Sequence, residues 1–326
     1  MRYKKLGRTD IDVSVVALGT WALGGLDFGR VDDLDAIKTV HRAIDMGVTL
    51  FDTAPIYGDG HAEVILGKAF AGGLRKDVVI ATKCGPVSVR QGLIRMDLSP
   101  SGIERQCDES LRRLKTDYID LLQVHWNDPN YPIEETMIAL ENLIRKGKIR
   151  AFGVSNFSPE ELKKACDGHN VASLQSRYSL LDRLVEEKIL PFCLKKSVAF
   201  LAYEPLGRGV LAGKMDAKRR FDDGDIRKRD ARFSMPFFQR LLDRVEEFKI
   251  LAKRENVLPS QLAIAWILAN KAVTSVIFGA KSPAQVVENV MAADIDLDDV
   301  TVRKARQIFD DVAEGRGFEG SDEPER

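Results

Sequence analysis

The chain has 326 residues, and its 49 Lys and Arg residues balance its 49 Asp and Glu residues. This balance excludes a strong bulk attraction to nucleic acid or to an anionic membrane. No apolar run approaches the ~18 residues of a membrane helix, and the N-terminus leads into no apolar segment, so we expect a cytoplasmic protein. The cysteines match no metal-binding spacing, so we expect reduced thiols and no metal site. They are Cys84, Cys107, Cys166 and Cys193.

Short apolar runs alternate with helical segments along most of the chain. Continuous apolar runs of this length are typical of parallel strands that are buried on both faces. Helix start signals separate them, as at Ser158–Glu161, where a serine N-cap precedes proline and glutamate. Eight alternations favour a single closed (β/α)8 barrel of the α/β class. The predicted strands are Val15–Leu18, Thr49–Phe51, Val78–Thr82, Tyr118–Val124, Arg150–Val154, Ala172–Gln175, Ala199–Tyr203 and Thr274–Phe278.

Three segments break this alternation. Residues 3 to 14 hold two short runs around a turn at Gly7–Asp10, which predicts a β-hairpin ahead of the first barrel strand. Residues 206 to 236 are rich in Gly, Asp, Arg and Lys and predict a long loop after strand seven, either a functional lid or disordered. Residues 314–326 predict a disordered tail, which leaves residues 1–313 as one barrel domain.

Three consecutive strands end in residues that can hold or move a proton. Asp52 follows the second strand with Tyr57 five residues later, Lys83 follows the third strand, and His125 follows the fourth. Barrel enzymes carry their chemistry at the C-terminal ends of the strands, so these side chains are expected to meet. Taken singly, each also fits a structural role such as a cap, a salt bridge or a buried hydrogen bond. Their joint position favours an active site.

The chemistry of these four residues suits proton transfer to or from an oxygen atom. A tyrosine hydroxyl is a poor acid or base at neutral pH, because its ordinary pKa is about 10. An ammonium group at Lys83, paired with Asp52, is expected to lower the pKa of Tyr57. His125 is expected to donate a hydrogen bond to a substrate oxygen. Such a site would act on an oxygen bound to a carbon that changes oxidation state.

The segment after the eighth strand combines a cation with a helix start. Lys281 precedes Ser282, which is placed as an N-cap before Pro283 and Gln285. Free backbone N–H groups, the helix dipole and a nearby cation favour phosphate binding, and barrels often bind phosphate after strands seven and eight. A capped surface helix is the alternative interpretation.

Several of these segments, in this order, resemble the aldo-keto reductases, and the resemblance covers about residues 3 to 295. It is closest in style to the bacterial branch related to general-stress-protein reductases. The resemblance implies a (β/α)8 barrel that interconverts carbonyl and alcohol groups of aldehydes, ketones or sugars with NADP(H). In it Tyr57 would be the general acid, Lys83 and Asp52 would tune its pKa, and His125 would orient the carbonyl. The segments are Leu18–Trp21, Phe51–Gly58, Ile80–Lys83, Gln123–Trp126 and Gly147–Phe157.

The resemblance also implies where NADP(H) binds. The carboxamide and ring of the nicotinamide would lie at the ends of strands five to seven, and the segment after strand seven would cover the pyrophosphate. The 2′-phosphate and the adenosine would bind after strand eight. Lys281 stands where many members carry arginine. A lysine is a point charge without a fork, so NAD(H) is expected as a weaker cofactor. The implied residues are Ser155, Asn156, Gln175, Tyr203, Leu206, Arg208, Gly209, Lys214, Gly279, Lys281, Ser282, Gln285 and Asn289.

Other residues have two interpretations each. Trp21 and Trp126 are candidates for the substrate pocket, with Phe28 and Phe237, and ordinary packing at the barrel mouth is the alternative. Cys84 is expected to face away from the pocket, because side chains alternate along a strand.

Charged residues of the long loop also have two interpretations. Arg227 with the Asp222 and Asp223 pair could close over a cofactor as a lid. Solvated loop charge is the favoured interpretation.

Two other functions would use the same barrel. One is a nucleotide-binding regulatory subunit with the same fold and little turnover, similar to the potassium-channel β-subunits. The presence of all four candidate catalytic residues argues against it. A barrel isomerase or aldolase would use Lys83 as a Schiff-base amine and would need no nicotinamide. Substrate identity depends on loops rather than on the scaffold, so the sequence predicts only that the partner is a small-molecule carbonyl or alcohol. The sequence does not indicate the oligomeric state.

Overall fold

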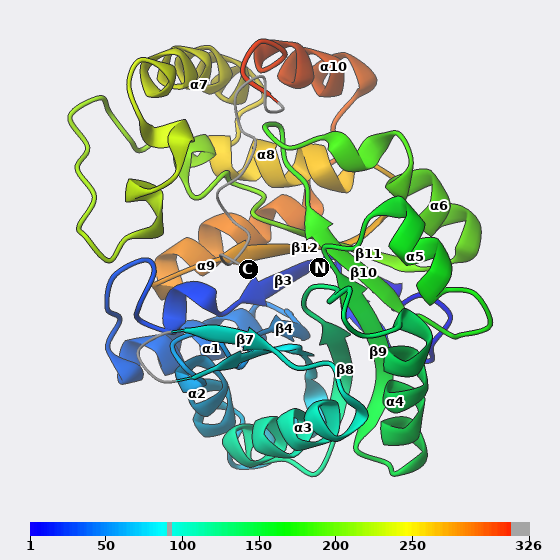
Figure 1. Cartoon of the computed structure of the whole chain (residues 1–326). Helices are drawn as coiled ribbons and strands as arrows, with labels where there is room; N and C mark the ends of the chain where they lie inside the picture. The colour runs from blue at the N-terminus through cyan, green and yellow to red at the C-terminus, as the bar shows by residue number, and fades with distance from the viewer. Residues whose placement is uncertain (90–92, 314–326) are drawn as a thin grey trace.

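The computed structural model describes residues 1–89 and 93–313 (Figure 1). In this part of the chain, eight parallel strands close a barrel in the order β10-β11-β12-β3-β4-β5-β8-β9. Each predicted strand is confirmed, with ends that shift by at most two residues. The strands are β3 (Val16–Gly19), β4 (Leu50–Asp52), β5 (Val79–Cys84), β8 (Ile119–Val124), β9 (Ile149–Ser155), β10 (Ser173–Arg177), β11 (Ala199–Tyr203) and β12 (Val273–Gly279).

Helices surround the strands and bury their outer face (Figure 1). Leu50 and Phe51 of β4 are both fully buried, Leu50 inside the barrel and Phe51 in the core shared with the helices. Burial on both faces explains the continuous apolar runs. The helices are α1 (Asp33–Asp45), α2 (His61–Ala69), α3 (Pro100–Leu114), α4 (Ile133–Arg145), α5 (Pro159–Ala165), α6 (Ile189–Lys196), α7 (Phe237–Arg254), α8 (Pro259–Leu268), α9 (Pro283–Val290) and α10 (Asp299–Ile308).

The predicted N-terminal hairpin is confirmed as the antiparallel pair β1 (Tyr3–Lys5) and β2 (Asp12–Ser14). Leu6, Ile11 and Val13 of this hairpin join the cluster of side chains that fills the barrel interior. Gly7 at its turn has a φ of +61°, and a Cβ there would lie 2.3 Å from the carbonyl oxygen of Ala172. The hairpin therefore packs into the barrel and leaves the C-terminal ends of the strands to form the site.

Two features of the fold were not predicted. A second hairpin, β6 (Pro86–Ser88) and β7 (Ile94–Met96), follows β5, and α10 extends the barrel beyond α9. The predicted long loop after strand seven is present over residues 206–236, where three 3-10 turns give it a defined path and Asp225 and Asp230 cap two of them. The predicted tail 314–326 lies outside the described residues. No helix in the described part of the chain is long and apolar enough to cross a membrane.

Candidate active site

A cavity of about 2370 Å³ opens where the barrel strands end at their C-terminal side. With one exception, every residue that the sequence analysis placed in the catalytic, cofactor or substrate groups lines this cleft. The exception is Lys83, whose side chain is fully buried in the barrel. The long segment after β11 and the turn that follows β3 also contribute to the walls. The strand ends therefore gather the candidate residues around one large opening.

Asp52, Lys83 and Tyr57 form one connected group. Asp52 of β4 pairs with Ala81 of β5, so Lys83, two residues further on, lies on the same side of the sheet. The Nζ of Lys83 donates to Asp52 Oδ1 at 2.7 Å and to the carbonyl oxygen of Thr53 at 2.9 Å. The same Nζ lies 3.3 Å from the hydroxyl of Tyr57. An acid, an amine and a phenol thus meet in a buried site, as the spacing of the strands predicts.

His125 lies beside this group at the end of β8. Its ring faces the ring of Tyr57 edge-on at 6.1 Å and stacks on the indole of Trp126 at 3.8 Å. The side chain is buried, and its Nδ1 has no hydrogen-bond partner among the described residues. Burial, and then the charge of Lys83, hold the pKa of His125 well below its ordinary value. His125 is therefore a neutral imidazole with one N–H to donate.

The direction of the pKa shift of Tyr57 differs from the prediction. Burial and the charge of Asp52 raise the pKa of Tyr57 well above its ordinary value, where we expected Lys83 to lower it. The ammonium of Lys83 is already bound to Asp52, and burial lowers the pKa of Lys83 itself although Asp52 opposes this. Loss of water around the phenolate therefore outweighs the nearby positive charge. Tyr57 keeps its proton and is ready to donate it.

The buried neutral state of His125 predicts an acid-sensitive stability. Below about pH 6.5 the unfolded chain takes up a proton on this residue while the folded protein does not, so the free energy of unfolding falls. The slope should be up to ~1.4 kcal/mol per pH unit steeper in the wild type than in His125→Gln. Urea unfolding between pH 7.5 and 5 measures it, with His61→Gln at the half-exposed surface as control. Parallel curves for wild type and His125→Gln would contradict the neutral assignment.

Amide and hydroxyl groups cluster at the ends of β9, β10 and β11. Gln175 Nε2 donates to Asp52 Oδ2 at 2.6 Å, which ties the amide group to the acid of the catalytic candidates. The hydroxyl of Tyr203 donates to Asn156 Oδ1 at 2.9 Å, and Asn156 Nδ2 donates to Ser155 Oγ at 3.2 Å. The structure thus brings together the four residues predicted for the nicotinamide. Their donors and acceptors match the chemistry of a carboxamide.

The start of α9 carries the predicted cation and N-cap. Ser282 Oγ accepts from the backbone N–H of Gln285 at 3.4 Å, as predicted. The side chain of Gln285 accepts from the backbone N–H of Lys281 at 2.7 Å. Lys281 Nζ donates to the carbonyl oxygen of Phe28 at 2.7 Å. Asn289 is buried, and its amide donates to Gly279 at 3.4 Å.

Local positive charge surrounds Lys281. Burial lowers the pKa of Lys281, the nearby charges of Arg227 and Arg219 lower it further, and the charge of Asp225 opposes them. All three basic side chains line the cleft: Lys281 lies just before α9, and Arg219 and Arg227 lie in the long loop. A concentration of cations beside a helix N-terminus suits an anionic group such as a phosphate.

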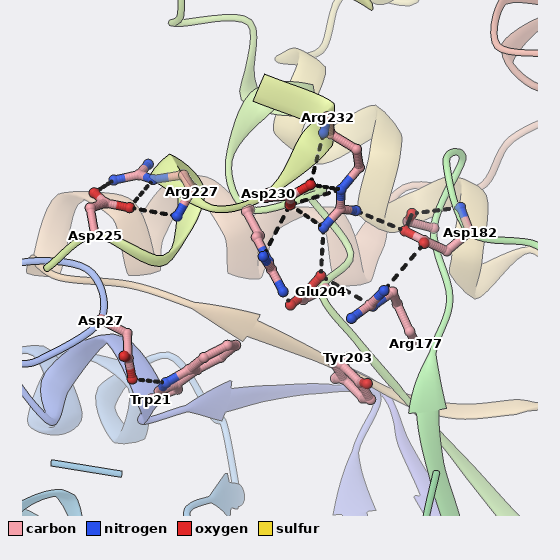
Figure 2. Close-up of polar contacts among 12 residues, drawn as sticks. Trp21, Asp27, Arg177, Asp182, Tyr203, Glu204, Asp225, Arg227, Asp230 and Arg232 are labelled. Carbon is pink, nitrogen blue, oxygen red and sulfur yellow. Dashed lines mark hydrogen bonds and ion pairs between the residues drawn. The ribbon is translucent and has the colours of Figure 1, made fainter. Parts of the chain in front are cut away.

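The sequence analysis missed a buried charge cluster next to Tyr203. Glu204 lies within 3.6 Å of three guanidinium groups, and Asp230 accepts from Arg208 at 3.0 Å and from Arg232 at 2.7 Å. Figure 2 shows Arg177, Glu204, Asp230 and Arg232 converging from β10, the end of β11 and the long loop. We call this the arginine cluster; its members are Arg177, Asp182, Glu204, Arg208, Asp230 and Arg232.

The arginine cluster changes the view of Arg208. This residue lines the cleft as predicted, yet its guanidinium is bound to Glu204 and Asp230 rather than left to the solvent. Lys214, predicted beside it, is exposed and pairs with Glu288. A repeated Asp-x-Arg pattern in the long loop was the available signal, because in each repeat the aspartate caps a 3-10 turn and binds the arginine.

The first of these Asp-x-Arg repeats corrects the interpretation of Arg227. Its partner is Asp225, in a two-pronged contact of 2.8 and 2.5 Å, and not Asp222 or Asp223. The guanidinium lies over the rings of Phe28 and Phe221, so it is not solvated loop charge.

The long loop also touches the turn after β3, where the predicted pocket residue Trp21 lies. The N–H of Ile226 donates to the carbonyl oxygen of Asp27 at 2.9 Å. The carboxylate of Asp27 in turn accepts from the indole N–H of Trp21 at 2.6 Å, as Figure 2 shows. Trp21 stacks on Tyr57 at 5.9 Å. The loop is thus joined to the aromatic wall of the cleft.

Comparison with known proteins agrees with this geometry. The Aldo/keto reductase family matches residues 15–310. The chain belongs to the aldo/keto reductase family. Aldo-keto reductase YhdN of Bacillus subtilis (strain 168) is 40% identical over 288 residues, which cover 88% of this chain and 87% of that protein. The NADH-specific methylglyoxal reductase of Escherichia coli (strain K12) is 35% identical, over 94% of this chain and 98% of that protein.

A solved structure of an aldo/keto reductase relative has the same barrel. The glycerol dehydrogenase AKR11B4 from Gluconobacter oxydans superimposes with a TM-score of 0.87 at 37% identity, over 94% of each chain. Aldo/keto reductases are oxidoreductases of small-molecule carbonyl compounds that use nicotinamide cofactors. Family membership thus favours this chemistry over a Schiff-base aldolase. Among the described residues no group of His, Cys, Asp and Glu could hold a metal ion, and the cysteines there are free thiols.

Proposed function

We propose that this protein is an NADP(H)-dependent reductase of aldehydes, ketones or sugars, in which Tyr57 is the general acid. The observation that carries the proposal is the contact of Tyr57 with the Lys83–Asp52 pair in a cleft that also holds neutral His125. A protonated phenol supplies the proton that carbonyl reduction requires. An imidazole N–H supplies a neutral donor for the same carbonyl oxygen.

Each residue of the group has a separate task in this proposal. A nicotinamide cofactor held by the residues at the ends of β9, β10 and β11 would supply the hydride that carbonyl reduction requires. Tyr57 gives its proton to the carbonyl oxygen, and Lys83 stabilises the phenolate that remains. Asp52 holds Lys83 in place, while Gln175 fixes the second oxygen of Asp52. His125 donates to the carbonyl oxygen and orients it, which it can do without carrying a charge that would repel Lys83.

The residues present fit a phosphorylated dinucleotide. Ser155, Asn156 and Gln175 would hold the carboxamide of the nicotinamide, and Tyr203 would stack on its ring. Leu206, Arg208, Gly209 and Lys214 would cover the pyrophosphate, and Gln285 with Asn289 would contact the adenosine. Lys281 and Ser282, with the charges of Arg219 and Arg227 close by, support a site for the 2′-phosphate. One relative is named as NADH-specific, so NAD(H) remains the weaker alternative cofactor in this proposal.

The 2′-phosphate assignment predicts a selective loss on removal of Lys281. In Lys281→Ala the Kd for NADPH should rise about 10- to 150-fold, since a hydrogen bond to a charged group contributes about 1.5–3 kcal/mol. The Kd for NADH should change less than twofold. Fluorescence titration of both cofactors measures the two effects, with Lys281→Arg as the variant that keeps the charge. An equal loss for both cofactors would contradict the assignment.

A direct assay separates the proposal from its competitors. Purified protein is mixed with NADPH or NADH and a set of aldehydes, ketones and sugars, and oxidation is followed at the nicotinamide absorbance. Turnover that is faster with NADPH is the expected result. Tight NADPH binding without turnover on any carbonyl would favour a nucleotide-binding regulatory subunit. Failure to bind NADPH, together with borohydride trapping on Lys83, would favour a Schiff-base enzyme.

A further inference from the structure

Glu63 is a buried acid that has no task in the proposed reaction. It lies in the first turn of α2, its side chain is fully buried, and it does not line the cleft. Acidic side chains are almost never buried so completely unless they are paired. The two oxygens of Glu63 accept hydrogen bonds from two other elements, through Thr82 of β5 and Arg113 of α3. This one carboxylate therefore joins three elements of the barrel wall.

The first oxygen of Glu63 binds the strand that carries Lys83. The hydroxyl of Thr82 donates to Glu63 Oε1 at 2.6 Å, and both side chains are fully buried. Thr82 directly precedes Lys83 in β5, and side chains alternate along a strand, so the two residues face opposite sides of the barrel wall. The contact therefore fixes α2 to β5 at the residue next to Lys83.

The same helix begins beside the turn that carries Tyr57. The carbonyl oxygen of Tyr57 accepts from the backbone N–H of Ala62 in the first turn of α2, at 3.2 Å. Glu63 follows Ala62 directly. One helical turn and one buried hydrogen bond thus connect the backbone of Tyr57 with that of Thr82 and Lys83. This connection helps to set the 3.3 Å between the Tyr57 hydroxyl and the Nζ of Lys83.

Arg113 holds the second oxygen of Glu63. Its Nε donates to Glu63 Oε2 at 2.5 Å, and its Nη2 donates to Ser110 Oγ at 3.3 Å. The side chain of Arg113 also crosses the turn between Tyr57 and α2. It passes so close that a Cβ on Gly60 would lie 2.7 Å from Arg113 Cδ. Arg113 therefore fixes the orientation of the carboxylate and packs against the turn that follows Tyr57.

The charge of Glu63 also acts on the ammonium group of Lys83. Burial lowers the pKa of Lys83, and the charges of Asp52 and Glu63 oppose this shift. Asp52 does so in direct contact at 2.7 Å, whereas Glu63 does so from the helix side of β5, where it binds Thr82. Both carboxylates therefore favour the charged form of Lys83.

We propose that Glu63 is a positioning residue for carbonyl reduction. Through Thr82 and the first turn of α2, it holds the hydroxyl of Tyr57 and the ammonium of Lys83 at the separation that proton transfer needs. This inference rests on the proposed reductase function. The competing interpretation is a buried ion pair that only stabilises the fold. A displacement of about 1 Å between reacting groups can lower a rate about 100-fold, so the two interpretations predict different kinetics.

Thr82→Val and Thr82→Ser test the inference, because valine has the shape of threonine without the hydroxyl and serine keeps the hydroxyl. With NADPH and one aldehyde, we expect kcat to fall about 10- to 100-fold in Thr82→Val and to stay within about threefold of the wild type in Thr82→Ser. KM and the Kd for NADPH should stay near wild-type values in both variants, because neither Thr82 nor Glu63 lines the cleft. Steady-state kinetics and fluorescence titration measure these quantities at a temperature where circular dichroism shows each variant folded.

Glu63→Gln and Asp120→Asn separate positioning from the loss of a buried charge, and they decide the question if Thr82→Val does not fold. Asp120 is also fully buried, binds Arg75 at 2.7 Å and accepts from the N–H of Ile80 at 3.0 Å, near the start of the same strand β5. It does not line the cleft. Both substitutions should destabilise the fold, since each leaves a buried arginine without its carboxylate. Only Glu63→Gln should lower kcat, by about 10-fold or more.

The double variant Thr82→Val with Tyr57→Phe adds a further test. Residues that act as a unit have non-additive effects, so the double variant should be no slower than Tyr57→Phe alone. An additive loss would overturn the inference and leave the reductase function standing. The same holds for wild-type kcat in folded Thr82→Val, or for equal losses in Glu63→Gln and Asp120→Asn. Absence of turnover by the wild type on every carbonyl would instead overturn the reductase function, and the inference with it.

Discussion

Replacing Tyr57 with phenylalanine is expected to lower kcat for carbonyl reduction by about 10²- to 10⁴-fold, the usual contribution of a positioned proton donor. The substitution removes one hydroxyl and keeps the ring that stacks against Trp21 and faces His125. NADPH binding should therefore stay within twofold of the wild type. Steady-state kinetics on one aldehyde and fluorescence titration of NADPH measure the two quantities on the same preparation.

The matched control is Tyr178→Phe, because it removes the same hydroxyl group elsewhere in the barrel. The hydroxyl of Tyr178 donates to Glu186 at 2.8 Å, and the residue does not line the cleft. We expect it to cost about 1 kcal/mol of stability and to leave kcat unchanged. Turnover by Tyr57→Phe at the level of Tyr178→Phe would contradict the role of Tyr57 as the acid.

The second large effect concerns stability and the arginine cluster. Asp230→Ala is expected to lower the free energy of unfolding by about 3–5 kcal/mol, the usual result of breaking a buried ion pair from one side. The guanidinium groups of Arg208 and Arg232 would lose the carboxylate that both contact within 3.0 Å, deep in the wall of the cleft. Urea unfolding followed by circular dichroism measures the change.

Asp223→Ala in the same loop is the matched control. Asp223 also forms an ion pair, with Lys228, but its side chain is 95% exposed. Exposed pairs contribute about 0–1 kcal/mol, so this variant should be close to the wild type. Equal effects of the two substitutions would show that the arginine cluster does not anchor the loop.

The barrel could be predicted from the sequence because its strands are buried on both faces. A run such as that around Phe51 has apolar residues on both sides of the strand, and this pattern depends on the local sequence alone. The meeting of Asp52, Lys83 and His125 followed from the same argument, since parallel strands present their C-terminal ends on one face. The β6–β7 hairpin was not predicted, although its strands are as long as those of the predicted N-terminal hairpin.

Other features depend on contacts between distant segments. Glu204 meets Arg177 and Arg232, which come from 27 residues before it and 28 after it, and no local pattern indicates such a meeting. The pKa of Tyr57 was predicted in the wrong direction because the sequence shows the neighbouring charge and not the extent of burial. The link from Ile226 to Asp27 likewise joins two loops that only the folded barrel places together.

The pairing of β12 with β3 has a consequence for synthesis of the chain. Residues 16–19 find their partner only at residues 276–279, so the sheet has two open edges until nearly the whole barrel has left the ribosome. Unpaired strand edges readily join with other chains. Pairing over such a sequence distance is also slow. The nascent protein therefore exposes two strand edges until β12 has emerged, and a chaperone that shields strand edges should raise its soluble yield.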